Sequence, residues 1–180
     1  MKLLAFDYGA SSGRGILGTY DGKKLQLNEI HRFSNDPVML NGTLYWDVLR
    51  LFHELKTGIL KCIQEGHQDI CGIGVDTWGV DFGLIGASGE LLGNPVHYRD
   101  IRTEGMMEEA YKIVPKRGIY EETGIQFMVF NTLYQLLYLR LKNPALLENA
   151  DKMLLMPDLF NYFLSGEKYS EYSIASTTQL

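Results

Sequence analysis

Two tight-turn signals divide the start of the chain into three short strands, and this pattern constrains the fold more than any other feature. An apolar run at 3–7 ends at one carboxylate, and a cluster of small residues separates it from a second strand at 14–20. The Asp-Gly dipeptide at 21–22 predicts a hairpin turn with positive φ at both residues. A third strand of alternating polarity follows at 24–33. The chain therefore begins as a sheet of strands joined by tight turns.

A helix is expected at 47–65, because apolar residues recur there every three or four positions. Asp47 is placed to cap its first turn, and Gly66 is placed to end it. The apolar stripe expected to face the core comprises Leu49, Phe52, Leu55, Ile59 and Ile63.

The remaining residues alternate between strands and helices. Buried strands are predicted at 70–76 and 80–86, and a third strand ends at Pro157. Helices are predicted near 103–115, 132–141, 144–150 and 158–165. This order predicts an α/β fold with a sheet covered by helices on both faces, in one domain by length.

Composition excludes several classes of protein. A net charge of −5 disfavours a general nucleic-acid partner, and no apolar run is long enough to cross a membrane. The two cysteines, Cys62 and Cys71, have no metal-binding spacing, so we expect reduced thiols and a cytoplasmic protein.

The small residues after the first strand indicate a phosphate site. They are Ala10, Ser11, Ser12 and Gly13, and Arg14 follows them directly. Small residues let the backbone approach an anion, serine adds hydroxyl donors, and arginine matches phosphate oxygens. Asp7 beside them would repel a bare phosphate but suits a bridging Mg²⁺. The turn thus predicts a metal-bound nucleotide phosphate, with an ordinary tight hairpin as the alternative.

Two other phosphate motifs are excluded. Residues 13–18 match G-x-G-x-x-G, but that fingerprint must open a helix, and the turn at 21–22 comes too soon. A Walker loop is absent from the sequence.

A second cluster, GVDTWGVDFG at 74–83, predicts a polyol-binding bend. Gly79 suggests a close approach, Trp78 offers a flat wall, and Asp81 could accept hydrogen bonds from hydroxyls. The alternative is a turn with solvated acids, and a glycosidase pair of Asp76 and Asp81 ranks last. Polar residues at 97–103 suit a pocket rim or, alternatively, a helix cap.

Seven segments together resemble the FGGY carbohydrate kinases: FDYGASSGRG, EIHRF, VDTWGVDFG, HYRDIRT, GIQFMVFNTLYQL, LLMPD and EYSIASTTQL. The resemblance runs nearly end to end. It implies two ribonuclease-H-like lobes of the actin and hexokinase type, with the active site between them. Residues 1–180 would be the N-terminal part of the first lobe, and the C-terminal nucleotide-binding lobe would be absent from this chain.

The resemblance also implies roles for individual residues. Asp7 would lie near Mg²⁺, and residues 10–14 would surround the ATP phosphates. The sugar would lie against Gly79, Asp81, Tyr98 and Phe130. The general-base aspartate is expected beyond Leu180, so we expect this chain alone to transfer phosphate negligibly.

The activity that the resemblance implies is ATP-dependent phosphorylation of L-rhamnulose on its 1-hydroxyl. Two alternatives remain open from the sequence. One is a kinase of another ketose or polyol, such as xylulose or glycerol. The other is a non-catalytic, actin-like nucleotide-binding regulator.

Overall fold

The computed structural model describes residues 1–180 and divides them into two compact units, where length alone led us to expect one. Unit 1 comprises residues 1–36 and 47–78, and unit 2 comprises residues 37–46 and 79–180. No helix is both long and apolar enough to cross a lipid bilayer.

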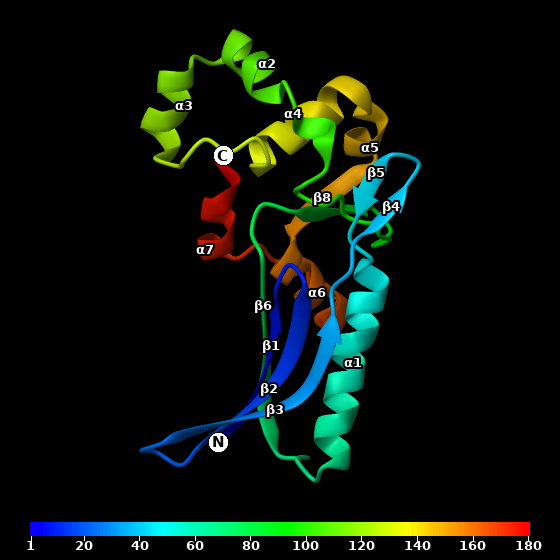
Figure 1. Ribbon diagram of the computed structural model, residues 1–180, viewed down its shortest axis with the longest axis vertical. Coiled ribbons are helices and arrows are strands. Elements are labelled where there is room, and N and C mark those ends of the chain that lie inside the picture. Colours follow the sequence, from blue (N-terminus) through cyan, green and yellow to red (C-terminus); the bar gives the residue numbers. More distant parts are fainter. The chain divides into compact units, whose positions relative to one another are not determined.

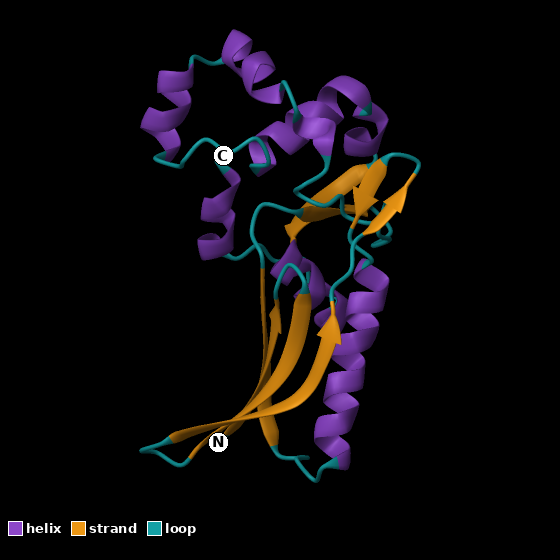
Figure 2. Ribbon diagram, viewed as in Figure 1, coloured by secondary structure: helices purple, strands orange, loops and turns teal.

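Unit 1 is built on a four-stranded mixed sheet with the strand order β3-β2-β1-β6 (Figure 1). Figure 2 shows its strands in orange beside one long helix. The strands are β1 (Lys2–Tyr8), β2 (Ser12–Tyr20), β3 (Leu25–Ser34) and β6 (Ile70–Thr77). The first three pair antiparallel, as predicted, and β6 pairs parallel to β1. Parallel strands must be joined by a crossover connection, and the helix between β3 and β6 is part of that connection.

The hairpin at 21–22 is confirmed, but its turn is of a different kind. Of its two residues only Gly22 has a positive φ, of 101°. The Asp21 carboxylate instead accepts hydrogen bonds from the amides of Lys23 and Lys24, both at 2.8 Å. A wider loop closed by this side chain therefore replaces the predicted two-residue turn.

Helix α1 (Val48–Gln64) begins and ends as predicted but presents a different face to the core. The Asp47 side chain accepts from the Arg50 amide at 3.1 Å, and Gly66 adopts φ 90°. The buried residues are Val48, Leu51, Leu55, Gly58 and Cys62. Leu49, expected in the core, is 63% exposed. The helix carries apolar residues on two adjacent stripes, and its packing along β2 and β3 selects one of them (Figure 1).

We predicted that strand β6 would be buried, but it is not. It lies at the edge of the sheet with β1 as its one neighbour. The sheet face that carries Leu3 and Ala5 is also open, since α1 is the one helix of unit 1. Both cysteines are free thiols, Cys62 buried in α1 and Cys71 exposed on β6.

Unit 2 contains two short antiparallel pairs of strands and most of the helices. The strands β4 (Val38–Leu40) and β5 (Thr43–Tyr45) form one pair, and β7 (Phe82–Gly86) and β8 (Ala150–Leu155) form the other. The β4–β5 hairpin was not predicted.

The four helices predicted for unit 2 are present, but one begins later than predicted and two further helices were not predicted. They are α2 (Met106–Ile113), α3 (Lys116–Thr123), α4 (Thr132–Lys142), α5 (Pro144–Glu148), α6 (Met156–Ser165) and α7 (Tyr172–Ala175), with 3-10 turns at Ile101–Thr103 and Ser176–Thr178. The helix predicted at 103–115 begins later, because Gly105 adopts a left-handed φ of 76°. Helices α3 and α7 were not predicted. Mixed strand pairing with flanking helices confirms the α/β class.

Candidate functional site

The turn between β1 and β2 leaves backbone donors open. The turn closes through a hydrogen bond from the Gly9 amide to the Ser12 carbonyl at 2.9 Å. The amides of Ala10 and Ser11 donate no hydrogen bond within the chain, and both residues are exposed. The hydroxyls of Ser11 and Ser12 likewise have no partner in the protein. Two free amides beside two free hydroxyls provide a group of donors suited to an anion.

Asn35, just past the end of β3, holds this turn in place. Its side-chain amide donates to the Gly9 carbonyl at 2.8 Å, and its backbone amide donates to the Ser11 carbonyl at 3.0 Å. The residue is buried, and its side-chain oxygen has no partner. We did not predict this role, because an asparagine before Asp-Pro resembles an ordinary loop residue.

Gly13 is glycine for a reason other than the predicted one. It lies within β2, opposite Tyr8 and Phe33, rather than in the open turn. A Cβ atom there would overlap the ring of Phe33. The missing side chain therefore serves packing inside unit 1, and the open donors lie at residues 10 and 11.

A row of charged residues crosses the sheet beside the turn. Asp76, Asp7, Arg14 and Arg32 are neighbours on β6, β1, β2 and β3. One oxygen of Asp7 accepts from Nε and Nη2 of Arg14, both at 2.9 Å. Arg14 is thus held by Asp7 at the mouth of the turn, about half exposed.

Two carboxylates in this row fit a magnesium ion. The second oxygen of Asp7 has no partner, and Asp76 is exposed on the next strand in register with it. Mg²⁺ binds one or two carboxylates and completes its shell with water and phosphate oxygens. No group of three or more His, Cys, Asp or Glu side chains gathers that could hold a metal by itself. The donor set suits a metal that arrives with a phosphate.

The predicted sugar-binding bend in unit 2 is a strained three-residue turn. The Asp81 amide donates to the Gly79 carbonyl at 2.9 Å, around a Val80 residue with φ 66°. A β-branched residue rarely adopts this conformation, so its surroundings must hold it there. Thr132 donates to the Val80 carbonyl at 2.7 Å, and the Val80 amide donates to Thr177 at 3.2 Å.

Gly79 is approached closely, as its type suggested, but by the protein's own chain. A Cβ atom there would lie 2.9 Å from the hydroxyl of Thr177. The C-terminal segment STTQL therefore contributes to the bend, which we did not predict.

Asp81 requires a correction, because its carboxylate is completely buried and accepts three hydrogen bonds from the protein. The donors are Trp46 Nε1 at 2.6 Å, the Tyr98 amide at 3.0 Å and Gln135 Nε2 at 2.9 Å. No face of it is available to a sugar hydroxyl in this arrangement. Its geometry is that of a positioning residue that fixes Tyr98.

Gln135 of α4 connects the predicted residues and was missed. Its amide also donates to the carbonyl of Phe130 at 2.9 Å, and its oxygen accepts from Arg102 at 2.7 Å. The sequence feature that could have indicated this role is a glutamine within the largely apolar run TLYQLLYL. Gln135 is buried there, and a buried polar side chain must find hydrogen-bond partners.

Tyr98 and Phe130, both expected to lie against the sugar, are in contact with each other. Their rings meet edge to face with centroids 5.5 Å apart, and both side chains are partly exposed. They form an aromatic wall anchored by Asp81 and Gln135. Such a wall suits the apolar face of a sugar ring.

His97 is structural, in line with the alternative interpretation of residues 97–103. Its ring stacks on Trp46 at 3.9 Å, and its Nδ1 accepts from the Arg99 amide. Burial and, to a smaller extent, the positive charge of Arg99 lower the pKa of His97 to about 4. Asp100 caps the 3-10 turn by accepting from the Arg102 amide, so this part of the segment also serves the fold.

The sequence matches known proteins along its whole length. Residues 2–180 match the N-terminal domain of the FGGY family of carbohydrate kinases. The chain is 48% identical over 177 residues to a rhamnulokinase of Oceanobacillus iheyensis, covering 98% of this chain and 37% of that protein. It is 46% identical over 179 residues to a rhamnulokinase of Bacteroides thetaiotaomicron, covering 99% of this chain and 37% of that protein. The chain therefore spans little more than a third of these relatives.

Solved structures agree on the fold. A xylulose kinase from Lactobacillus acidophilus superposes with a TM-score of 0.85 at 20% identity, over 99% of this chain and 36% of that one. A glycerol kinase from Plasmodium falciparum, solved with ADP, gives a TM-score of 0.74 at 21% identity, over 99% of this chain and 37% of that one. These superpositions confirm the predicted fold of the actin and hexokinase type. With the match over residues 2–180, the chain belongs to the FGGY family of carbohydrate kinases.

Proposed function

We propose that these residues are the N-terminal part of an ATP-dependent kinase that phosphorylates L-rhamnulose to L-rhamnulose 1-phosphate. The observation that carries this proposal is the 48% identity to a rhamnulokinase along 98% of the chain. The xylulose and glycerol kinases named above share the fold at about 20% identity only. Sequence, rather than fold, therefore supports the choice of sugar.

In this proposal the turn after β1 binds the transferring phosphate. The free amides of Ala10 and Ser11 donate to its oxygens, and Arg14 offsets the charge that develops on them. Asp7, with Asp76 beside it, would hold Mg²⁺, and the ion would supply positive charge that neutralises the phosphate. The protein contributes position and charge, because phosphoryl transfer needs little covalent work from it.

The reaction that this implies is an in-line displacement. The sugar hydroxyl oxygen attacks the terminal phosphorus of ATP, and the bond from that phosphorus to the bridging oxygen breaks to release ADP. The hydroxyl proton goes to a general-base aspartate, which we place beyond Leu180 together with the second, nucleotide-binding lobe. Tyr98 and Phe130 would orient the sugar.

A chimaera tests the proposal. Residues 1–180 are joined to the part of the Oceanobacillus iheyensis rhamnulokinase that follows its matched region, and ADP release is measured with L-rhamnulose, D-xylulose and glycerol. We expect turnover with L-rhamnulose in preference to the other two, and negligible turnover by the 180-residue chain alone. In the chimaera, Asp7→Asn should lower kcat about a hundredfold, whereas the exposed control Asp36→Asn should not.

Three other outcomes would each overturn a different part of the proposal: the sugar, the kinase activity or the position of the general base. Preference for D-xylulose or glycerol would overturn the sugar and keep the kinase. ATP binding or hydrolysis that no sugar stimulates would favour the regulator. Phosphorylation of L-rhamnulose by the isolated chain would overturn the assignment of the general base to a position beyond Leu180.

A further inference from the structure

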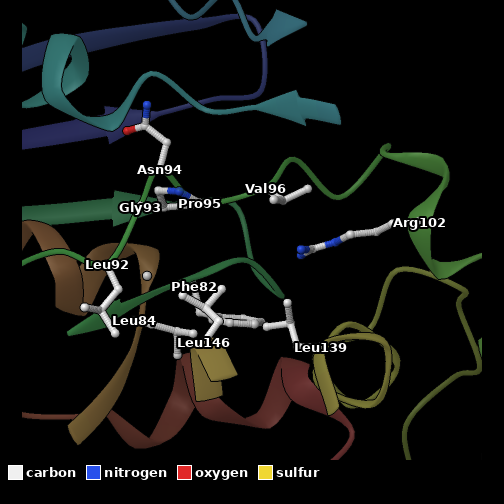
Figure 3. A pocket seen from close by; sticks show the side chains of 11 residues that line it. Phe82, Leu84, Leu92, Gly93, Asn94, Pro95, Val96, Arg102, Leu139 and Leu146 are labelled. Carbon is white, nitrogen blue, oxygen red and sulfur yellow. The ribbon is translucent and has the colours of Figure 1, made fainter. Parts of the chain in front are cut away.

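Unit 2 encloses a cavity that the proposed kinase site does not use. Its volume is about 490 Å³, and it opens between β5, the segment 92–96 and α4. A smaller apolar pocket adjoins it and shares Val96, Arg102 and Leu139 with it. In Figure 3 the Arg102 side chain points into the space between Val96 and Leu139.

The charged residues that line this cavity have one sign. Arg102 and Lys142 are basic, and no Asp or Glu lines either pocket. The Lys142 ammonium is exposed and forms no hydrogen bond or ion pair within the chain. In a protein of net charge −5, a concavity lined by two cations and no acid selects anions.

Arg102 retains donors for a ligand. Its guanidinium donates to Gln135 Oε1 at 2.7 Å and lies 5.8 Å from the ring centre of Tyr138, but forms no ion pair. Desolvation lowers the pKa of Arg102, and the negative charges of Asp81 and Asp100 partly offset this by raising it. Both carboxylates already accept other hydrogen bonds, from Trp46 Nε1 and from the Leu44 amide among others. A guanidinium has five N–H donors, so most of those of Arg102 remain available.

Thr43, Tyr45 and Tyr138 also line the cavity, and their three hydroxyls have no hydrogen-bond partner within the chain. Two cations and three hydroxyls exceed what the two oxygens of one carboxylate can accept. They match the three terminal oxygens and double charge of a phosphate monoester. The adjoining pocket is lined by Phe82, Leu84 and other apolar side chains, so it suits an apolar group next to that phosphate.

We propose that this cavity is a second ligand site, which binds a small phosphate monoester. Arg102 and Lys142 hold its phosphate, and its organic part lies against Leu139 and Leu146. The site lies wholly within unit 2, and the proposal does not depend on the kinase function.

The test is a titration of the 180-residue chain with phenyl phosphate, followed by calorimetry and by amide and arginine NMR signals. We expect saturable 1:1 binding, with shifts at Arg102 Nε and at the amides of Tyr138 and Lys142. Inorganic phosphate should bind at least about fivefold more weakly, because it lacks the apolar group. Equal affinities would show that the apolar pocket takes no part and would overturn that half of the proposal.

Variants separate the site from general charge effects. Lys142→Gln should weaken phenyl phosphate binding about threefold to tenfold, and Lys142→Arg should retain it. The matched control Lys152→Gln removes an exposed positive charge from β8 and should leave the affinity unchanged. Arg102→Lys, with its fold checked by circular dichroism, should weaken binding about tenfold because the planar fork is lost.

Two results would overturn the proposal. One is the absence of saturable binding at concentrations up to about 10 mM. The other is shifts confined to the turn at residues 9–14 of unit 1, with Lys142→Gln and Lys152→Gln indistinguishable. That pattern would place the phosphate on the turn after β1 instead.

Discussion

Single side chains decide whether the two candidate regions keep their shape, and Asn35 is the clearest case in unit 1. Replacing Asn35 with Ala removes the hydrogen bond to the Gly9 carbonyl and should cost about 1 kcal/mol of unfolding free energy. Asn35→Asp should cost more, because a buried carboxylate oxygen would then face that carbonyl. Urea unfolding measures both, and faster hydrogen exchange at the Gly9 and Asn35 amides should accompany the loss.

The control for this prediction is Asn28→Asp, an exposed residue on β3. It makes the same chemical change on the strand that precedes Asn35 and should alter stability little. If Asn35→Asp were as mild as Asn28→Asp, the turn would not depend on this side chain.

Asp81 plays the corresponding part in unit 2. Asp81→Asn leaves one acceptor oxygen for three buried donors and should cost about 2–4 kcal/mol of unfolding free energy. The fluorescence of buried Trp46, which donates to this carboxylate, would follow the transition in urea.

Asp76→Asn is the matched control, because Asp76 is the exposed acid of the same short segment. Its stability should change by less than about 0.5 kcal/mol. Equal effects of the two substitutions would mean that Asp81 is not the hub that its hydrogen bonds indicate.

At the scale of single elements, two helical glycines should respond in opposite ways to alanine. In α1 a Cβ atom at Gly58 would lie 2.6 Å from the ring of Phe6, and in α3 one at Gly118 would lie 3.6 Å from Val114. Alanine favours a helix by about 1 kcal/mol over glycine. We therefore expect Gly118→Ala to stabilise by about 0.5–1 kcal/mol, whereas Gly58→Ala should destabilise, because overpacking costs about 1–3 kcal/mol.

Circular dichroism during urea unfolding would measure this pair. The two substitutions share the change in propensity, so their difference isolates the contact between α1 and Phe6. If both substitutions were stabilising, Phe6 would have to move aside, and α1 would be packed less tightly on the sheet than the contact at Gly58 indicates.

For the whole molecule, His97 should make stability depend on pH. The folded chain keeps His97 neutral down to a pKa of about 4, against an ordinary value of 6.5. Between these values the unfolded chain binds more protons, so stability should fall as the pH drops from about 6.5 to about 4. The slope from this group is at most about 1.4 kcal/mol per pH unit.

His97→Asn keeps an acceptor near the position of Nδ1 and removes the titration, so it should flatten this part of the profile. The control His53→Asn, at an exposed position of α1, should leave the profile unchanged. Unfolding in urea at several pH values, followed by Trp46 fluorescence, compares the three chains. Parallel profiles for all three would show that His97 does not carry the dependence.

Local patterns predicted much of the fold. The strands of the first 34 residues and the ends of α1 agree with expectation, because turn residues, caps and periodicity act over a few neighbouring positions. The edge position of β6 and the role of Asn35 were not predictable. They depend on which distant segments lie beside them.

The sequence by itself determined the α/β class, the small-residue turn beside Asp7 and, through its motifs, the family. The tertiary structure decided which side chains remain free to meet a ligand. It buried the Asp81 carboxylate under three donors and left the amides of Ala10 and Ser11 open. The physical reason is that a hydrogen-bonding group is available only after the fold has assigned its partners, and those partners come from residues far away in the chain.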